Sequence, residues 1–89
     1  MGAIEEYAEV AETDFLIFTG NFCGYCSALK RYLPSKGMTF TEYNMDEHPG
    51  LREEVVNATR HRTVPVVFDL RSGVPKYIGG FDETTAFLG

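Results

Sequence analysis

The hydrophobic pattern in the first half of the chain predicts a strand, a helix and a second strand. Residues 15–19 are apolar on both faces, as a central strand covered on both sides requires. Residues 39–44 bring β-branched and aromatic side chains in near alternation, which favours a strand. Between them, residues 24–36 place apolar side chains on one helical face and Lys30 and Arg31 on the other. A helix of this length permits a parallel crossover, so this half is predicted to be a β-α-β unit.

Two further helices are predicted around this unit. Near the N-terminus, apolar residues recur at helical spacing: Ile4, Tyr7, Ala8 and Ala11. They predict a short amphipathic helix over residues 3–12. A second helix is predicted over residues 49–59, with Pro49 in its first turn and Leu51 and Val55 on its buried face.

The last third of the chain predicts a hairpin and a closing helix. Strands are expected at residues 66–70 and 75–78, joined by a turn at residues 71–73. Gly79-Gly80 then interrupts the chain, and Asp82 is expected to cap a short helix over residues 83–88.

Composition and charge limit the class of protein. The 89 residues suit one domain, and 44% hydrophobic with 24% charged residues is typical of a globular chain. No apolar run is long enough to cross a bilayer. The acidic N-terminal segment lacks the basic region of a secretory signal, so we expect a cytoplasmic protein. A net charge of −5 argues against nucleic acid as a partner, and the small cluster Arg60-His61-Arg62 suits a small anion better.

The candidate chemistry lies in Cys23-Gly24-Tyr25-Cys26, which holds both cysteines of the chain. The motif follows the first predicted strand directly and opens the predicted helix. It therefore places Cys23 at a helix N-terminus, where free backbone N–H groups and the helix dipole favour a thiolate. Cys26 lies about one turn further into the helix and is more shielded. This arrangement predicts thiol–disulfide exchange, with Cys23 as the nucleophile and Cys26 as the resolving thiol.

Two simpler interpretations of the motif fit less well. A structural zinc site would need two more ligands, and only His48 and His61 are available, too far apart for the usual spacing. A structural disulfide that closes a two-residue loop would stabilise the fold little, because stabilisation grows with loop length. We assign no catalytic role to either histidine and expect Phe22, next to Cys23, to be partly hydrophobic filler.

Three spaced motifs together resemble the glutaredoxin family, a branch of the thioredoxin fold. They are Cys23-Gly24-Tyr25-Cys26, Thr63-Val64-Pro65 and Gly79-Gly80-Phe81-Asp82, and the resemblance covers about residues 14–88. It implies an α/β fold with a four-stranded mixed sheet, strand order 2-1-3-4, flanked by helices. The helix at residues 3–12 would be an addition, and the last helix would be short.

The resemblance also assigns a glutathione site. It implies a cis Val64-Pro65 bond that faces the cysteines and leaves the Val64 main chain free to pair with the cysteinyl part of glutathione. The remaining residues implied to bind glutathione are Tyr25, Arg52, Arg62, Thr63, Gly80, Phe81 and Asp82. Of these, the segment from Gly80 to Asp82 would receive the γ-glutamyl group at a helix N-terminus, and the two arginines would meet the glycyl carboxylate.

Two positions depart from the family pattern. The family often has a lysine three residues before the first cysteine, where this chain has Gly20. Gly24 replaces a common proline, and in some relatives a small residue there accompanies a [2Fe–2S] cluster held by a dimer and two glutathiones. Cys23 would be the cluster ligand from this chain.

We therefore expect a monomeric glutathione-dependent oxidoreductase that reduces protein–glutathione mixed disulfides and protein disulfides, with glutathione reductase closing the cycle. One alternative is an electron donor to ribonucleotide reductase that is itself reduced by thioredoxin reductase. The other is a [2Fe–2S] carrier. The absence of tryptophan and the Gly-Tyr loop argue against thioredoxin itself.

Overall fold

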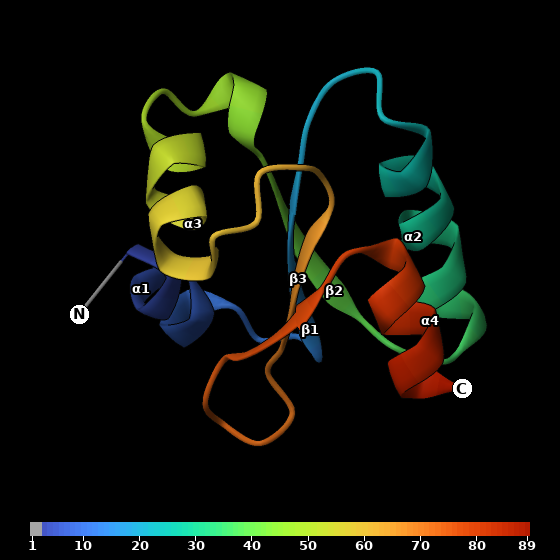
Figure 1. Cartoon of the computed structure of the whole chain (residues 1–89). Helices are drawn as coiled ribbons and strands as arrows, with labels where there is room; N and C mark the ends of the chain where they lie inside the picture. The colour runs from blue at the N-terminus through green and yellow to red at the C-terminus, as the bar shows by residue number, and fades with distance from the viewer. Residues whose placement is uncertain (1–2) are drawn as a thin grey trace.

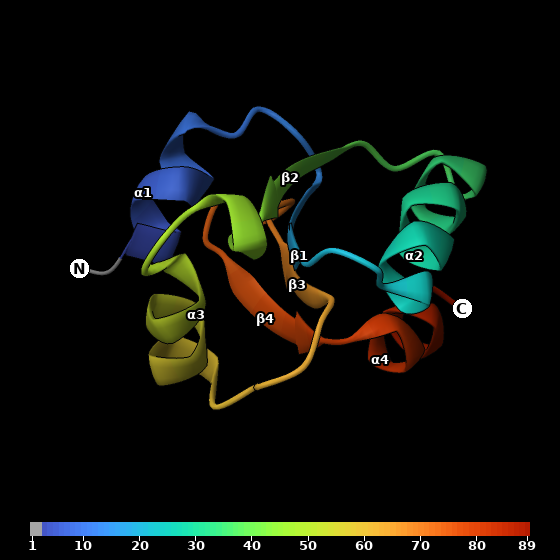
Figure 2. The same ribbon diagram turned by 90° about the horizontal axis from the view of Figure 1, so that it is seen from above.

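The computed structural model describes residues 3–89 and places one sheet between two pairs of helices (Figures 1 and 2). The elements are α1 (Ala3–Val10), β1 (Phe15–Thr19), α2 (Gly24–Ser35), β2 (Phe40–Asn44), a 3-10 turn η1 (Met45–Glu47), α3 (Leu51–Thr59), β3 (Val66–Asp69), β4 (Lys76–Gly79) and α4 (Phe81–Leu88). The four-stranded sheet has the order β2-β1-β3-β4, with β1 parallel to β2 and antiparallel to β3. The predicted thioredoxin fold is confirmed.

The central strand β1 divides the core into two halves, as its apolar sequence predicts. Leu16 and Phe18 face the side covered by α1 and α3, where they pack with Val55. Phe15 and Ile17 face the side covered by α2 and α4, where they pack with residues such as Leu29. All five strand residues are buried, because helices cover both faces of the sheet.

Two predicted helix starts are wrong by up to two residues. α3 begins at Leu51 instead of Pro49, because Gly50 adopts a left-handed backbone (φ 85°) that a helix cannot continue. α4 begins at Phe81, with Gly80 and not Asp82 as its N-cap residue. The Glu83 carboxylate accepts the Gly80 N–H at 2.8 Å, so the capping interaction comes from within the helix.

Smaller differences concern the ends of other elements. α1 ends at Val10, two residues before the predicted boundary. The 3-10 turn Met45–Glu47 was not predicted; the Asn44 side chain starts it by accepting the Asp46 N–H at 2.9 Å. The hairpin strands β3 and β4 lie at the predicted place within one residue at each end.

Candidate functional site

The two cysteines lie at the start of α2, where the chain leaves the central strand. Cys23 is the N-cap residue, and its Sγ accepts a hydrogen bond from the Cys26 N–H at 3.1 Å. This amide and the helix N-terminus present partial positive charge to the sulfur. Cys23 is half-buried, whereas Cys26 is only 3% exposed, and both are free thiols. The predicted difference in shielding between the two sulfurs is confirmed.

Burial also separates the two thiols chemically. The pKa of the Cys26 thiol is raised from 9.0 to about 12. Burial is the largest cause, and the hydrogen bond with Cys23 and the nearby charge of Cys23 add to the rise. Cys26 is therefore protonated throughout the physiological range while Cys23 is free. Its thiol cannot compete as a nucleophile in that state, because the thiolate is the reactive form.

This difference predicts how Cys26 reacts with an alkylating agent. In a Cys23→Ser variant at pH 8, we expect iodoacetamide to modify Cys26 on the order of a hundredfold more slowly than an exposed thiol, because burial persists without Cys23. A thiol with a raised pKa loses its proton only as the pH approaches the raised value. The alkylation rate should thus climb with pH well above 9, where an ordinary thiol is already levelling off. A rate that levels off near pH 9 in the folded variant would contradict this.

The loop before Cys23 is anchored to the end of β2. The Asn21 N–H donates to Asp46 Oδ2 at 2.6 Å, and this bond, followed by the one from Arg52, lowers the pKa of Asp46. Asn44 Nδ2 donates to Asn21 Oδ1 at 2.9 Å. Phe22 then adopts a left-handed backbone (φ 55°) and is fully exposed beside the nucleophile. The expectation that Phe22 is partly hydrophobic filler is wrong.

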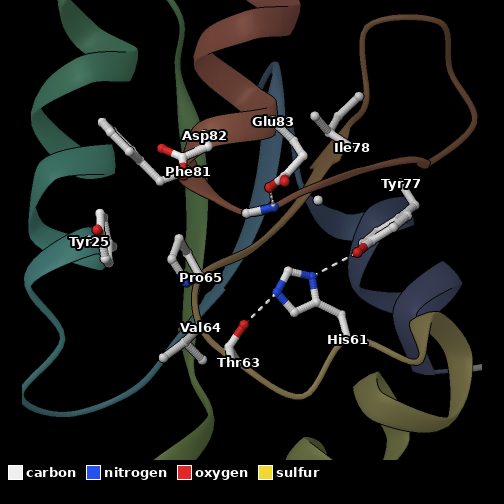
Figure 3. A pocket seen from close by; sticks show the side chains of 12 residues that line it. Tyr25, His61, Thr63, Val64, Pro65, Tyr77, Ile78, Phe81, Asp82 and Glu83 are labelled. Carbon is white, nitrogen blue, oxygen red and sulfur yellow. Dashed lines mark hydrogen bonds between the residues drawn. The ribbon is translucent and has the colours of Figure 1, made fainter.

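A groove of about 420 Å³ begins next to the cysteine loop, at Tyr25, and extends to β4 (Figure 3). It is lined by side chains and backbone from α2, the loop after α3, β4 and the start of α4. The lining residues are Tyr25, His61, Thr63, Val64, Pro65, Tyr77, Ile78, Gly79, Gly80, Phe81, Asp82 and Glu83. Seven of the nine residues predicted to bind glutathione are among them.

The Val64-Pro65 loop connects this groove to the nucleophile. The Val64-Pro65 peptide bond is cis, as predicted. Cys23 Sγ lies 3.7 Å from the Val64 carbonyl oxygen, to which the thiol donates. Neither cysteine lines the groove itself, so the Val64 main chain is the link between a ligand in the groove and the reacting sulfur. A second pocket of about 440 Å³ opens directly on Cys23 and Cys26.

The far side of the groove is formed by the turn from β4 into α4. Glu83 accepts the Gly80 N–H. The backbone N–H groups of Phe81 and Asp82 lie in the first turn of α4, where a helix offers them no acceptor. The exposed Asp82 carboxylate lies in the first turn. The Phe81 ring lies 5.9 Å from the Tyr25 ring, so the two aromatic residues form one wall. Together with the helix-start N–H groups and the Asp82 carboxylate, this wall can hold a short peptide with an amino-acid end group.

The two arginines predicted to bind glutathione do not line the groove. Arg52 pairs with Asp46 at 2.9 Å, and its guanidinium lies 3.3 Å from where a Cβ at Gly20 would be. It therefore occupies the neighbourhood of the lysine that the family often has at position 20. Arg62 is exposed. Glutathione binding by either arginine stays a prediction.

Four residues of the groove lie outside the three predicted motifs: His61, Tyr77, Ile78 and Glu83. The position of Glu83 could have been predicted, since an acidic residue three positions after an N-cap residue often accepts the N-cap N–H. His61 was expected only as part of a small cationic cluster without a catalytic role, yet it hydrogen-bonds Thr63 and Tyr77 inside the groove. Its partner Tyr77 is distant in sequence, so no local pattern reveals the contact.

Residues 3–89 offer neither a metal site made of side chains alone nor a membrane-spanning helix. This part of the chain holds no group of three or more His, Cys, Asp or Glu side chains placed to bind a metal ion. An iron–sulfur cluster takes about four ligands, so the chain's own cysteines do not complete a cluster site. None of the helices in these residues has the length and apolar character needed to cross a membrane.

The comparison with protein families matches residues 15–71, more than half of the chain, to the model described as Glutaredoxin. The matched range contains the cysteine motif and the Thr63-Val64-Pro65 motif. Among curated proteins, Glutaredoxin 3 of Escherichia coli strain K12 is 36% identical over 70 residues, which cover 79% of this chain and 80% of the relative.

Solved structures show the same similarity in three dimensions. A crystal structure of wheat glutaredoxin superimposes with a TM-score of 0.80 at 26% identity, covering 96% of this chain and 77% of the wheat chain. A crystal structure of a buckwheat glutaredoxin–glutathione complex gives a TM-score of 0.76 at 26% identity, with 94% and 76% of the two chains covered.

Proposed function

The chain belongs to the glutaredoxin family, and from this we propose that it transfers electrons from glutathione to protein–glutathione mixed disulfides and to protein disulfides. Thiol–disulfide oxidoreduction through a Cys-x-x-Cys pair follows from the family and from the contact between the two cysteines, in which the Cys26 N–H donates to Cys23 Sγ. The choice of glutathione is carried by one observation: Val64 lines the groove, and its carbonyl oxygen lies 3.7 Å from Cys23 Sγ. A peptide bound there would bring its own sulfur to the nucleophile.

In the first step, the Cys23 thiolate attacks the glutathione sulfur of a mixed disulfide. The target protein leaves as a thiolate, and Cys23 now carries the glutathionyl group. A second glutathione attacks that disulfide, so oxidised glutathione leaves and the Cys23 thiolate is restored. One disulfide is exchanged for another: the glutathionyl group of the mixed disulfide and the one free glutathione that attacks it leave together as oxidised glutathione, and the target leaves as a thiol.

With a protein disulfide, Cys26 takes part. Cys23 attacks one sulfur of the target and forms a mixed disulfide with it. In the free protein, the hydrogen bond with Cys23 and the charge of Cys23 both raise the pKa of Cys26. Both causes are removed once Cys23 is part of the mixed disulfide. Cys26 then attacks Cys23, releases the reduced target and leaves a Cys23–Cys26 disulfide for two glutathiones to reduce.

The groove supports this substrate choice by its chemistry. Phe81 and Asp82 offer backbone N–H groups to the γ-glutamyl carboxylate, and the Asp82 carboxylate suits the neighbouring ammonium group. The buckwheat relative, with the same fold, was solved as a complex with glutathione. The groove also matches seven of the nine residues that the sequence resemblance assigned to glutathione.

The test is a coupled assay with NADPH, glutathione, glutathione reductase and the mixed disulfide of cysteine and glutathione. We expect turnover that depends on the protein and on glutathione. A parallel assay replaces glutathione and its reductase with thioredoxin reductase. Turnover only in the second assay would overturn the proposal and favour a donor that thioredoxin reductase serves, with ribonucleotide reductase as the expected acceptor.

A further inference from the structure

One side chain joins two elements of the groove that are distant in sequence. His61 Nε2 is 2.9 Å from Thr63 Oγ1, and His61 Nδ1 is 2.7 Å from the Tyr77 hydroxyl (Figure 3). Thr63 belongs to the loop between α3 and β3, whereas Tyr77 lies on the edge strand β4. The imidazole therefore links this loop to the sheet.

The sheet side of this link packs against the core. The Tyr77 ring packs at 5.8 Å against the ring of Phe68, which is 5% exposed and belongs to the hydrophobic core. The two rings are cross-strand neighbours, since Phe68 and Tyr77 pair in the β3–β4 ladder. The His61 ring meets the Tyr77 ring edge to face at 6.0 Å. The core thus fixes Tyr77, and Tyr77 fixes His61.

The loop side needs such support. In the described part of the chain, the backbone–backbone hydrogen bonds outside helices and strands include none from residues 62–65. The His61 N–H itself is held by Thr59 Oγ1 at 3.1 Å, just after Arg60 has ended α3 with a left-handed backbone. Side-chain bonds from His61 are therefore a main restraint on Thr63.

We infer that His61 is a positioning residue for the glutathione site: by bridging Thr63 to Tyr77, it holds the adjoining Val64 main chain in place beside Cys23. This inference rests on the proposed function, because it is the Val64 main chain that is taken to receive the peptide. His61 does not touch the reacting sulfur. It therefore acts on how well a glutathione-bearing substrate is oriented beside Cys23.

The experiment compares two small disulfides in a Cys26→Ser background, so that only the first exchange occurs. Cys23 attacks one sulfur of the disulfide, forms a mixed disulfide and releases the other half as a thiolate, which is measured by rapid mixing. The probes are oxidised glutathione, which carries the peptide, and 2-hydroxyethyl disulfide, which does not. Selectivity is the ratio of the two second-order rate constants.

In the His61→Ala variant, we expect selectivity for oxidised glutathione to fall about three- to tenfold, the size that losing one or two hydrogen bonds allows. The rate with 2-hydroxyethyl disulfide should fall less, because this disulfide carries no peptide for the groove to orient. His61→Gln, whose amide also has a donor and an acceptor, should recover part of the loss. Tyr77→Phe, which keeps the packing on Phe68 and removes one bond, should give a smaller fall.

His48→Ala is the matched control, since His48 is the other histidine of the chain, is exposed and lies outside the groove. Selectivity that is unchanged in both His61→Ala and Tyr77→Phe would overturn the inference. A parallel fall with both disulfides would also overturn it, because it would mean a general structural role. A parent variant with no preference for oxidised glutathione would instead contradict the proposed function, and the inference would fail with it.

Discussion

Replacing Cys23 with serine is expected to abolish glutathione-dependent reduction of mixed disulfides, with a loss of roughly a thousandfold or more. A serine hydroxyl is not ionised at neutral pH and cannot form the mixed disulfide. No other sulfur can substitute, since Cys26 is 3% exposed and burial raises the pKa of its thiol to about 12. The measurement is the initial rate in the coupled glutathione reductase assay.

Cys26→Ser is the matched control, because it removes the other sulfur of the same motif. This variant should keep its activity on the mixed disulfide of cysteine and glutathione, where a second glutathione completes the reaction. It should lose most of its activity on a protein disulfide, where Cys26 releases the target. If Cys23→Ser retained activity while Cys26→Ser lost it on both substrates, the roles assigned to the two thiols would be reversed.

The order of helices and strands could be predicted because the core positions follow simple local periods, whereas the order of strands in the sheet was expected from the family resemblance. Phe15–Thr19 is apolar at successive positions, and the structure buries every one of these residues between two helical layers. The cysteine motif was placed correctly for the same kind of reason, since the strand before it and the helix after it are local patterns. Element order and the position of the nucleophile could therefore be derived from one sequence.

The errors arose where a position depends on contacts distant in sequence or on backbone conformation. Phe22 appears apolar in sequence, but the bonds that fix Asn21 to Asp46 and Asn44 turn it outward. The bridge from His61 to Tyr77 spans sixteen residues and exists only once the loop lies against β4. Hydrophobic periodicity carries no information on such contacts.

The Arg52–Asp46 pair is a contact that neither the sequence pattern nor the family resemblance predicted. The family resemblance implied that Arg52 and Arg62 would meet the glycyl carboxylate of glutathione in a chain that lacks the lysine at position 20. In the structure the Arg52 guanidinium does lie beside Gly20, but there it already pairs with Asp46, whose other oxygen accepts the Asn21 N–H. Arg52 thus supports the loop that leads to Cys23, a role that could not be read from its position in the sequence.

A methyl group at Gly79 is expected to disrupt the end of the groove opposite the cysteines. Gly79 has φ 132°, a backbone region that residues with a Cβ rarely adopt. A Cβ there would lie 2.7 Å from Glu83 Cγ and 2.8 Å from Glu83 Cβ. The second atom is fixed to the backbone of α4, so rotation of the Glu83 side chain cannot relieve the overlap. The first turn of α4 must shift, and the bond from the Gly80 N–H to Glu83 is lost with it.

We expect Gly79→Ala to lower the free energy of unfolding by about 2 to 4 kcal/mol, from backbone strain together with the lost cap. In a chain of this size, that corresponds to a fall in melting temperature of roughly 10 to 25 °C, measured by circular dichroism. Gly24→Ala is the matched control, since nothing lies within 4 Å of its added Cβ and alanine favours the helix that it begins. It should melt at or slightly above the wild-type temperature. Equal melting temperatures for the two variants would mean that the turn from β4 into α4 yields easily, and that Gly79 is not needed to shape the groove.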